Sequence, residues 1–237
     1  MRKWFAVLAV VLSLCVSVVA ETREEFEARL TRELAAKDPQ AVAAWQQANV
    51  ARDAERNDEA IRLYAQVVAR VPSFVHALRR QAGCEMRAGR KQDALAHIRA
   101  AVEQERSSQN LSSLAMIIVA SEGNATEAAA VAREAIALDP SDEWALHALA
   151  GAANSLQDLE MLREATIRLE RVAAKSPQTH LLRVTVAVNE GNWDEAQAAL
   201  DRAKVFGLAP KERSRSCGRC STTSRRRSAR TRWTTCT

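Results

Sequence analysis

Residues 55–72 read ERNDEAIRLYAQVVARVP. The stretch begins with polar turn residues, continues as a helix with one apolar face, and stops at Pro72. The residues of the apolar face are Ile61, Tyr64, Val67, Val68 and Val71. An amphipathic helix must bury such a face against another element. The sequence predicts that this face packs on its two neighbours in the chain, the helical stretches 41–52 and 74–86.

The composition favours an all-α fold. Much of the apolar content is alanine, which favours helices that pack closely through small side chains. Seven glycines and five prolines are few for an all-β or loop-rich protein. Cys84 is the one cysteine between residues 21 and 210, so no disulfide framework is expected in that part of the chain.

Residues 1–20, MRKWFAVLAVVLSLCVSVVA, have the layout of a secretory signal peptide. Arg2 and Lys3 precede an apolar run, and small residues lead to an expected cleavage after Ala20. Cleavage would give an exported protein, periplasmic or extracellular, without a membrane span. The alternative is an uncleaved signal that anchors the protein in the membrane, although the apolar run is a little short for a span.

Prolines and glycines mark a regular period. The five prolines are Pro39, Pro72, Pro140, Pro177 and Pro210. Their separations are 33, 68, 37 and 33 residues, and 68 is twice 34. Gly89 and Gly123 are also 34 residues apart, and each precedes a helical run, as does Gly191. Because proline is tolerated where one helix has ended and the next begins, the period marks the boundaries of repeated units.

The units share alanines at corresponding places. In the second helix of the successive units these are Ala60, Ala94, Ala128, Ala165 and Ala196. Small residues inside the first helix are Ala48, Ala82, Ala150 and Ala187, whereas Met116 departs from this pattern. The pattern resembles the tetratricopeptide repeat, a helix–turn–helix unit of 34 residues. The resemblance implies an all-α solenoid of antiparallel helix pairs, with about five repeats in residues 39–210. An irregular bundle of alanine-rich helices is the alternative.

A separate amphipathic helix is expected before the repeats. Residues 21–38 place Phe26, Leu30 and Leu34 on one side of a helix. We expect this helix to cap the first repeat.

No catalytic or metal-binding motif is present in the sequence. It contains no phosphate-binding loop, no H-E-x-x-H and no G-x-S-x-G, and its four histidines are dispersed. The chain is therefore expected to be no enzyme and to use no metal or cofactor.

The resemblance implies a function in protein binding. The first helices of such a solenoid line a concave groove that binds extended peptides or partner helices. The residues that the resemblance places there are Trp45, Asn49, Arg52, His76, Arg79, Arg87, Trp144, His147 and Asn154. For the two tryptophans, packing on the neighbouring unit is an equal alternative. The family's clamp for chaperone carboxylates is not expected, because Trp45 stands in the place of its first lysine.

The basic charge of the chain belongs to its end. Residues 211–237 carry a net charge of +8, whereas residues 21–210 sum to −5, which argues against a nucleic-acid partner for the repeats. The tail is expected to be disordered, and its Arg/Ser/Thr/Cys content fits an out-of-frame or truncated end. A basic binding arm and a redox or metal pair of Cys217 and Cys220 are the alternatives.

The sequence thus predicts an exported, non-catalytic scaffold that binds a protein or peptide in its groove. The alternative is the non-catalytic N-terminal part of a longer enzyme or envelope protein. The DNA that follows the codon of Pro210 separates the two hypotheses. The oligomeric state is not predicted.

Overall fold

The computed structural model describes residues 21–121 and 123–207. Within them it contains α-helices and one short 3-10 helix, and no strand. These elements are α2 (Arg23–Lys37), η1 (Pro39–Ala41), α3 (Val42–Asp53), α4 (Asn57–Arg70), α5 (Val75–Arg87), α6 (Lys91–Gln104), α7 (Ser108–Ala120), α8 (Ala125–Leu138), α9 (Glu143–Leu156), α10 (Leu159–Val172), α11 (Pro177–Asn189) and α12 (Trp193–Val205). The all-α prediction is confirmed. The expected signal peptide and the expected tail lie outside the described residues.

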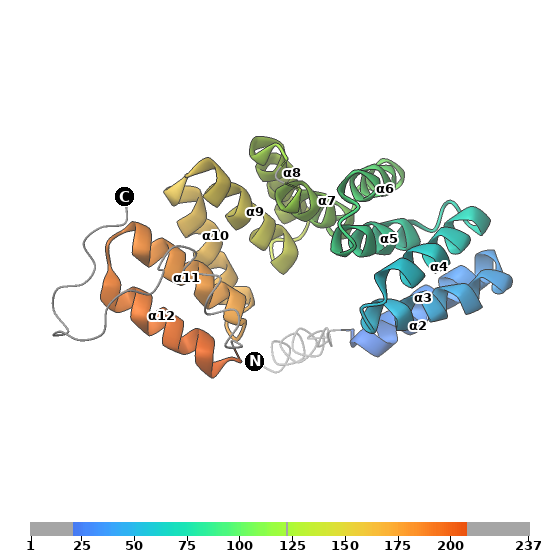
Figure 1. The fold of residues 1–237 in the computed structure, drawn as a ribbon, viewed down its shortest axis with the longest axis horizontal. Coiled ribbons are helices and arrows are strands. Elements are labelled where there is room, and N and C mark those ends of the chain that lie inside the picture. Colours follow the sequence, from blue (N-terminus) through green and yellow to red (C-terminus); the bar gives the residue numbers. More distant parts are fainter. Residues whose placement is uncertain (1–20, 122, 208–237) are drawn as a thin grey trace, which may run out of the picture.

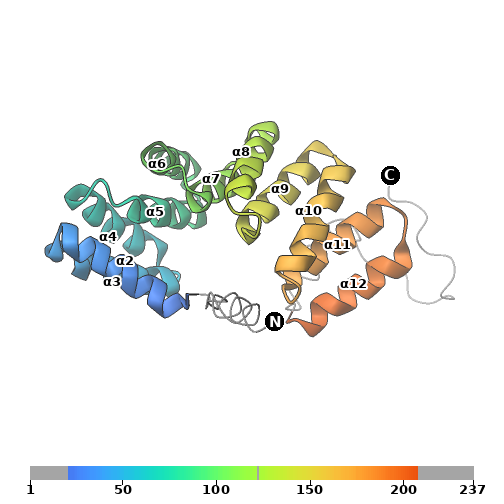
Figure 2. The same ribbon diagram turned by 180° about the vertical axis from the view of Figure 1, so that it is seen from behind.

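The helices after α2 form consecutive pairs: α3 with α4, α5 with α6, α7 with α8, α9 with α10, and α11 with α12. The pairs follow one another along an arch, with α6 and α8 on its outer side (Figures 1 and 2). The predicted solenoid of antiparallel helix pairs is therefore confirmed. None of the described helices combines the length and the apolar character that a bilayer span requires.

The stretch 55–72 forms the second helix of the first pair. Helix α4 ends at Arg70, two residues before Pro72, as expected for a residue that cannot continue a helix. Tyr64 and Val67 of α4 are fully buried, in one cluster with Trp45 of α3 and Ala77 of α5. The apolar face of α4 thus packs on its two neighbours in the chain.

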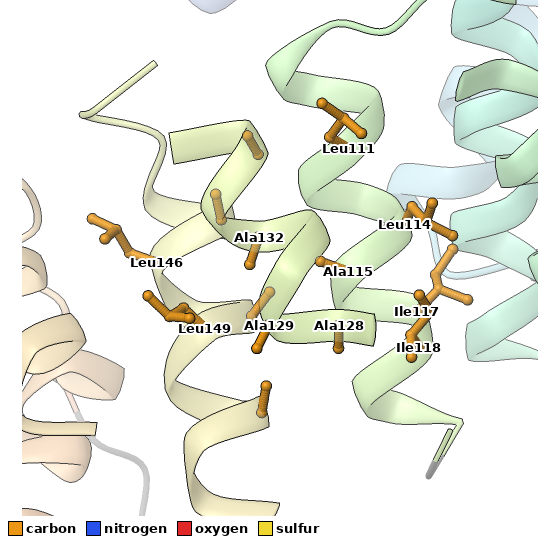
Figure 3. Close-up of a cluster of buried hydrophobic side chains, with 14 of the residues drawn as sticks. Leu111, Leu114, Ala115, Ile117, Ile118, Ala128, Ala129, Ala132, Leu146 and Leu149 are labelled. Atoms are coloured by element: carbon orange, nitrogen blue, oxygen red, sulfur yellow. The ribbon is translucent and has the colours of Figure 1, made fainter. Parts of the chain in front are cut away.

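Alanine sets the spacing of the helices in the middle of the arch. Ala128, Ala129 and Ala132 of α8 lie between α7 and α9 and are almost completely buried (Figure 3). Gly151 of α9 allows an even closer approach, because a Cβ atom there would stand 2.8 Å from Cγ1 of Val119. Small side chains let the backbones come close and still exclude water.

Candidate protein-binding groove

Trp45 belongs to the hydrophobic core. Its side chain has no exposed surface, and its ring meets those of Phe74 and Tyr64 edge to face, with centroid distances of 5.0 and 5.7 Å. Leu30 and Leu34 of α2 belong to the same cluster and are also fully buried. Trp45 is therefore packed and covered in this structure, which is the alternative that the sequence left open, and its role in partner binding stays a prediction.

A polar layer lies on the indole ring of Trp45. The guanidinium carbon of Arg80 stands 4.4 Å from the ring centroid, in cation–π geometry. Both Nη atoms of Arg80 donate to the carboxylate of Glu27, at 2.9 and 2.7 Å. Nη1 also donates to Oδ1 of Asn49 at 2.6 Å. Because Arg80 is only 8% exposed, these contacts replace the water that its charge loses.

Asn49 accepts a second hydrogen bond from the core side. The hydroxyl of Tyr64 donates to Oδ1 of Asn49 at 2.6 Å. Burial raises the pKa of Tyr64 to about 12, so its hydroxyl stays protonated and remains a donor. The side-chain oxygen of Asn49 is thus occupied by Tyr64 and Arg80.

Helix α2 packs on α3 and reaches α5 through two of its side chains. Glu27 pairs with Arg80, and the carboxylate of Glu33, further along α2, is 3.9 Å from Nε2 of His76. The earlier residue of α2, Glu27, meets the later residue of α5, and Glu33 meets the earlier one. The two helices therefore run antiparallel. Figures 1 and 2 show α2 alongside α3 at one end of the arch.

Arg79 forms no ion pair among the described residues, although the charges of Glu105 and Glu27 act on its guanidinium. Its Nη2 donates to Nδ1 of His76 at 3.3 Å, and its Nε is buried without a hydrogen-bond partner. Burial, with the charge of Arg80 nearby, lowers the pKa of Arg79 to about 10, so the guanidinium stays charged at neutral pH.

The imidazole of His76 is neutral at neutral pH. Burial lowers its pKa to about 4, and the charges of Arg79 and Arg80 add to this effect. A neutral ring explains why Nδ1 can accept from Arg79. The approach of the Glu33 carboxylate to this ring is therefore not a charged pair, despite its geometry.

Arg52 and Arg87 have local partners. Arg52 of α3 pairs with the adjacent Asp53 at 2.9 Å. Arg87, at the end of α5, is exposed and donates to Oδ1 of Asn57 at 3.0 Å and to the sulfur of Cys84 at 3.2 Å.

The remaining candidates lie on α9. Trp144 is 66% exposed at the start of this helix, and Asn154 is exposed near its end. His147 is half-buried, with Nε2 3.5 Å from the carboxylate of Glu143 one turn earlier. Burial lowers the pKa of His147, with Glu143 acting in the opposite direction. Unlike Trp45, Trp144 is accessible to a partner.

Arg80 and Glu27 are the residues of this surface that the sequence reasoning missed. They stand 53 positions apart, and no spacing or motif relates them. The one available signal is that Arg80 directly follows Arg79 in the first helix of a repeat. Two adjacent arginines point to different sides of a helix, so one of them is buried when the helix packs and needs an acidic partner.

Comparisons with known proteins agree on the repeat and the fold. Residues 46–110 match the tetratricopeptide-repeat family. A thermophilic tetratricopeptide-repeat protein of Thermus thermophilus has a similar structure, with a TM-score of 0.65 and 16% identity, over 75% of this chain and 97% of that one. PilW, a type IV pilus biogenesis factor, gives a TM-score of 0.64 and 14% identity, over 81% of this chain and 90% of PilW.

YrrB, a tetratricopeptide-repeat protein with an unusual peptide-binding site, is a further structural neighbour. It gives a TM-score of 0.53 and 14% identity, over 77% of this chain and 94% of YrrB. A search of curated protein sequences found no match. At these identities the likeness shows the fold.

Proposed function

Because this chain is a tetratricopeptide-repeat protein, we propose that it serves as an exported, non-catalytic scaffold that binds a protein or peptide along the first helices of its units. A solenoid of stacked helix pairs offers an extended surface of this kind. Peptide binding by the structural neighbour YrrB supports the proposal, as its fold is similar.

The guanidinium of Arg79, which no carboxylate of the described residues hydrogen-bonds, carries the proposal. A half-buried guanidinium with a buried, unpartnered Nε has lost part of its hydration without gaining a hydrogen bond to a carboxylate in return. A carboxylate of a partner would supply the missing charge-assisted hydrogen bond, in a place where water competes weakly. Arg79 is thus the proposed contact for an acidic group of the partner.

Trp144 supplies the proposed apolar contact. An indole that is 66% exposed loses much water-accessible area when a partner covers it. Tryptophan is also among the residues most often found as interface anchors. Trp144 and Arg79 lie in the first helices of the fourth and second pairs, so a partner that reaches both would span more than one unit.

Site-specific photo-cross-linking tests the use of the first helices. Benzoylphenylalanine is placed at Trp144 of α9 in one variant and at Leu138 of α8 in another, in the organism that makes the protein. Leu138 is the matched control, because it is apolar and 57% exposed but lies in the second helix of its pair.

The proposal expects a cross-linked protein or peptide from position 144 that is absent from position 138. It also expects Arg79→Gln to reduce this product. Equal products from both positions, or none from either, would contradict binding through the first helices.

Export is proposed from the pattern of residues 1–20. N-terminal sequencing of the protein from a periplasmic or culture-fluid fraction is expected to begin at Glu21. A chain that keeps residues 1–20 and fractionates with the membrane would instead support the uncleaved anchor.

A further inference from the structure

Helix α2 buries one narrow face, and Arg23 at its start forms an exposed ion pair with Asp53 of α3 at 3.0 Å. Of its 15 residues only Leu30 and Leu34 are buried, fewer than in any other α-helix of the described residues. Phe26 is half-buried and packs at the edge of the same cluster. A helix bound by so little surface can detach at a lower cost than the paired helices of the repeats.

The contacts of α2 follow a short pattern. Leu30 and Leu34 follow Glu27 by three and by seven residues, so all three share one face of the helix. The two leucines enter the apolar cluster, and Glu27 meets Arg80 at the border of that cluster. This is how an amphipathic helix binds in a groove, with apolar anchors and a polar contact that fixes its position.

We propose that α2 is an intramolecular ligand of the surface formed by α3 and α5, and that the partner for this surface is an acidic amphipathic helix that replaces it. The partner helix carries an acidic residue followed by leucines three and seven positions later, as in Glu27, Leu30 and Leu34. The inference rests on the proposed function, because α3 and α5 are first helices of their units and it names the class of partner that binds there.

Arg79 gives a partner an advantage over α2. Helix α2 forms an ion pair with Arg80 through Glu27 but gives the buried Nε of Arg79 no hydrogen-bond acceptor. A partner helix with a second acidic residue at the matching place would pair with both arginines, and so bind more tightly than α2 does.

The connection between α2 and the repeats is anchored independently of α2. The carboxylate of Asp38, just after α2, accepts from Nε of Arg70 at 2.7 Å. The side chain of Gln40 in η1 accepts from Nη2 of Arg70 at 2.6 Å. The chain is thus fixed at residues 38–40 to α4, so α2 can leave its place without disturbing the start of α3.

The test is a titration with a fluorescent peptide of residues 21–38, ETREEFEARLTRELAAKD. It is added to the full chain and to the full-chain variant Leu30→Asp/Leu34→Asp, whose own α2 cannot occupy the apolar cluster. We expect the variant to bind the peptide at least about tenfold more tightly than the unaltered protein. Circular dichroism verifies that the variant keeps its helices, and Glu27→Lys replaces it if it does not.

Arg80 and Arg79 provide a matched pair of controls. In the variant with the freed surface, Arg80→Gln is expected to weaken peptide binding about tenfold, because it removes the pair with Glu27. Arg79→Gln is expected to change it by less than about twofold, because α2 forms no ion pair with Arg79. A peptide with Glu27→Arg should in turn bind the Arg80→Glu variant better than the original peptide does.

Three results would overturn the inference. The first is a folded Leu30→Asp/Leu34→Asp or Glu27→Lys variant that does not bind the peptide. The second is an equal effect of Arg79→Gln and Arg80→Gln, which would indicate general charge attraction. The third is a dimer of the unaltered protein that exchanges α2 between copies, which would make a second copy the occupant. Cross-linking from Trp144 does not involve α2, so its outcome tests the proposed function separately.

Discussion

The guanidinium of Arg80 lies over the indole ring of Trp45 and at the same time pairs with Glu27. This relationship connects α3, α5 and α2, three helices that are not all neighbours in the chain. The cation covers the edge of an aromatic core, and the carboxylate of α2 neutralises it. This contact and the apolar cluster beneath it join α2 to the first two repeats, together with the pair of Arg23 with Asp53.

Arg80→Gln is expected to lower the free energy of unfolding by about 3 kcal/mol. The change leaves Glu27 without a cation and removes a donor from Asn49. Glu27→Gln is expected to cost less, about 1 kcal/mol, because Glu27 is more exposed than Arg80 and the amide oxygen can still accept. Urea denaturation measures both values. A larger loss for Glu27→Gln would show that α2, and not Arg80, dominates the contact.

The two tryptophans are expected to respond in opposite ways to replacement by alanine. Trp45→Ala should cost about 3–5 kcal/mol of unfolding free energy, since it opens a cavity in a fully buried cluster. Trp144→Ala should change stability by less than about 0.5 kcal/mol, because the side chain is mostly exposed. Thermal and urea unfolding check both. If Trp144→Ala destabilises as strongly, its indole is a packing residue and not a free contact for a partner.

His76 is expected to make the fold less stable in mild acid. Its pKa is about 4 in the folded protein and near 6.5 when the chain is unfolded, so the unfolded state takes up a proton first as the pH falls. Its contribution to stability is complete above about pH 6.5 and is lost progressively down to about pH 4, up to about 3 kcal/mol. Unfolding free energies measured across this window check the expectation.

The variant His76→Gln isolates this effect. His147 also has a lowered pKa and contributes in the same direction, so some pH dependence will remain in the variant. The difference between the two proteins is assigned to His76. An identical pH dependence of both would mean that His76 can take up a proton in the folded state.

The helical glycines Gly151 and Gly83 are expected to differ in sign when each is replaced by alanine. Gly151→Ala places a Cβ atom 2.8 Å from Cγ1 of Val119 and should cost about 1–3 kcal/mol. Adding Val119→Ala should relieve the clash and recover part of that loss. At Gly83 the nearest atom to a new Cβ is Nη1 of Arg87, 3.9 Å away, so Gly83→Ala should stabilise by about 0.5–1 kcal/mol. Destabilisation at both positions would contradict the packing described here.

The repeated part of the fold was predictable because its packing is local. Tyr64 of α4 packs on helices that begin and end within about one repeat of it, so the proline and alanine periods carry the information. The sequence led us to expect α2 beside the first repeat, but not its contact with α5, because Glu27 and Arg80 are far apart in the chain and belong to no period. The burial of Trp45 could not be decided from the sequence for the same reason, because part of what covers its side chain is α2.

Helix α5 is shared by two separate hydrophobic clusters. Ala77 and Cys84 belong to the aromatic-rich cluster of α2 to α5, and Leu78 and Ala82 belong to the alanine-rich cluster that continues along the arch. The described part of the chain therefore contains two hydrophobic modules that share helix α5. When the protein is pulled or exposed to denaturant, the two modules can unfold one after the other. A recombined protein that joins the first module to a different array has its natural crossover point in this helix.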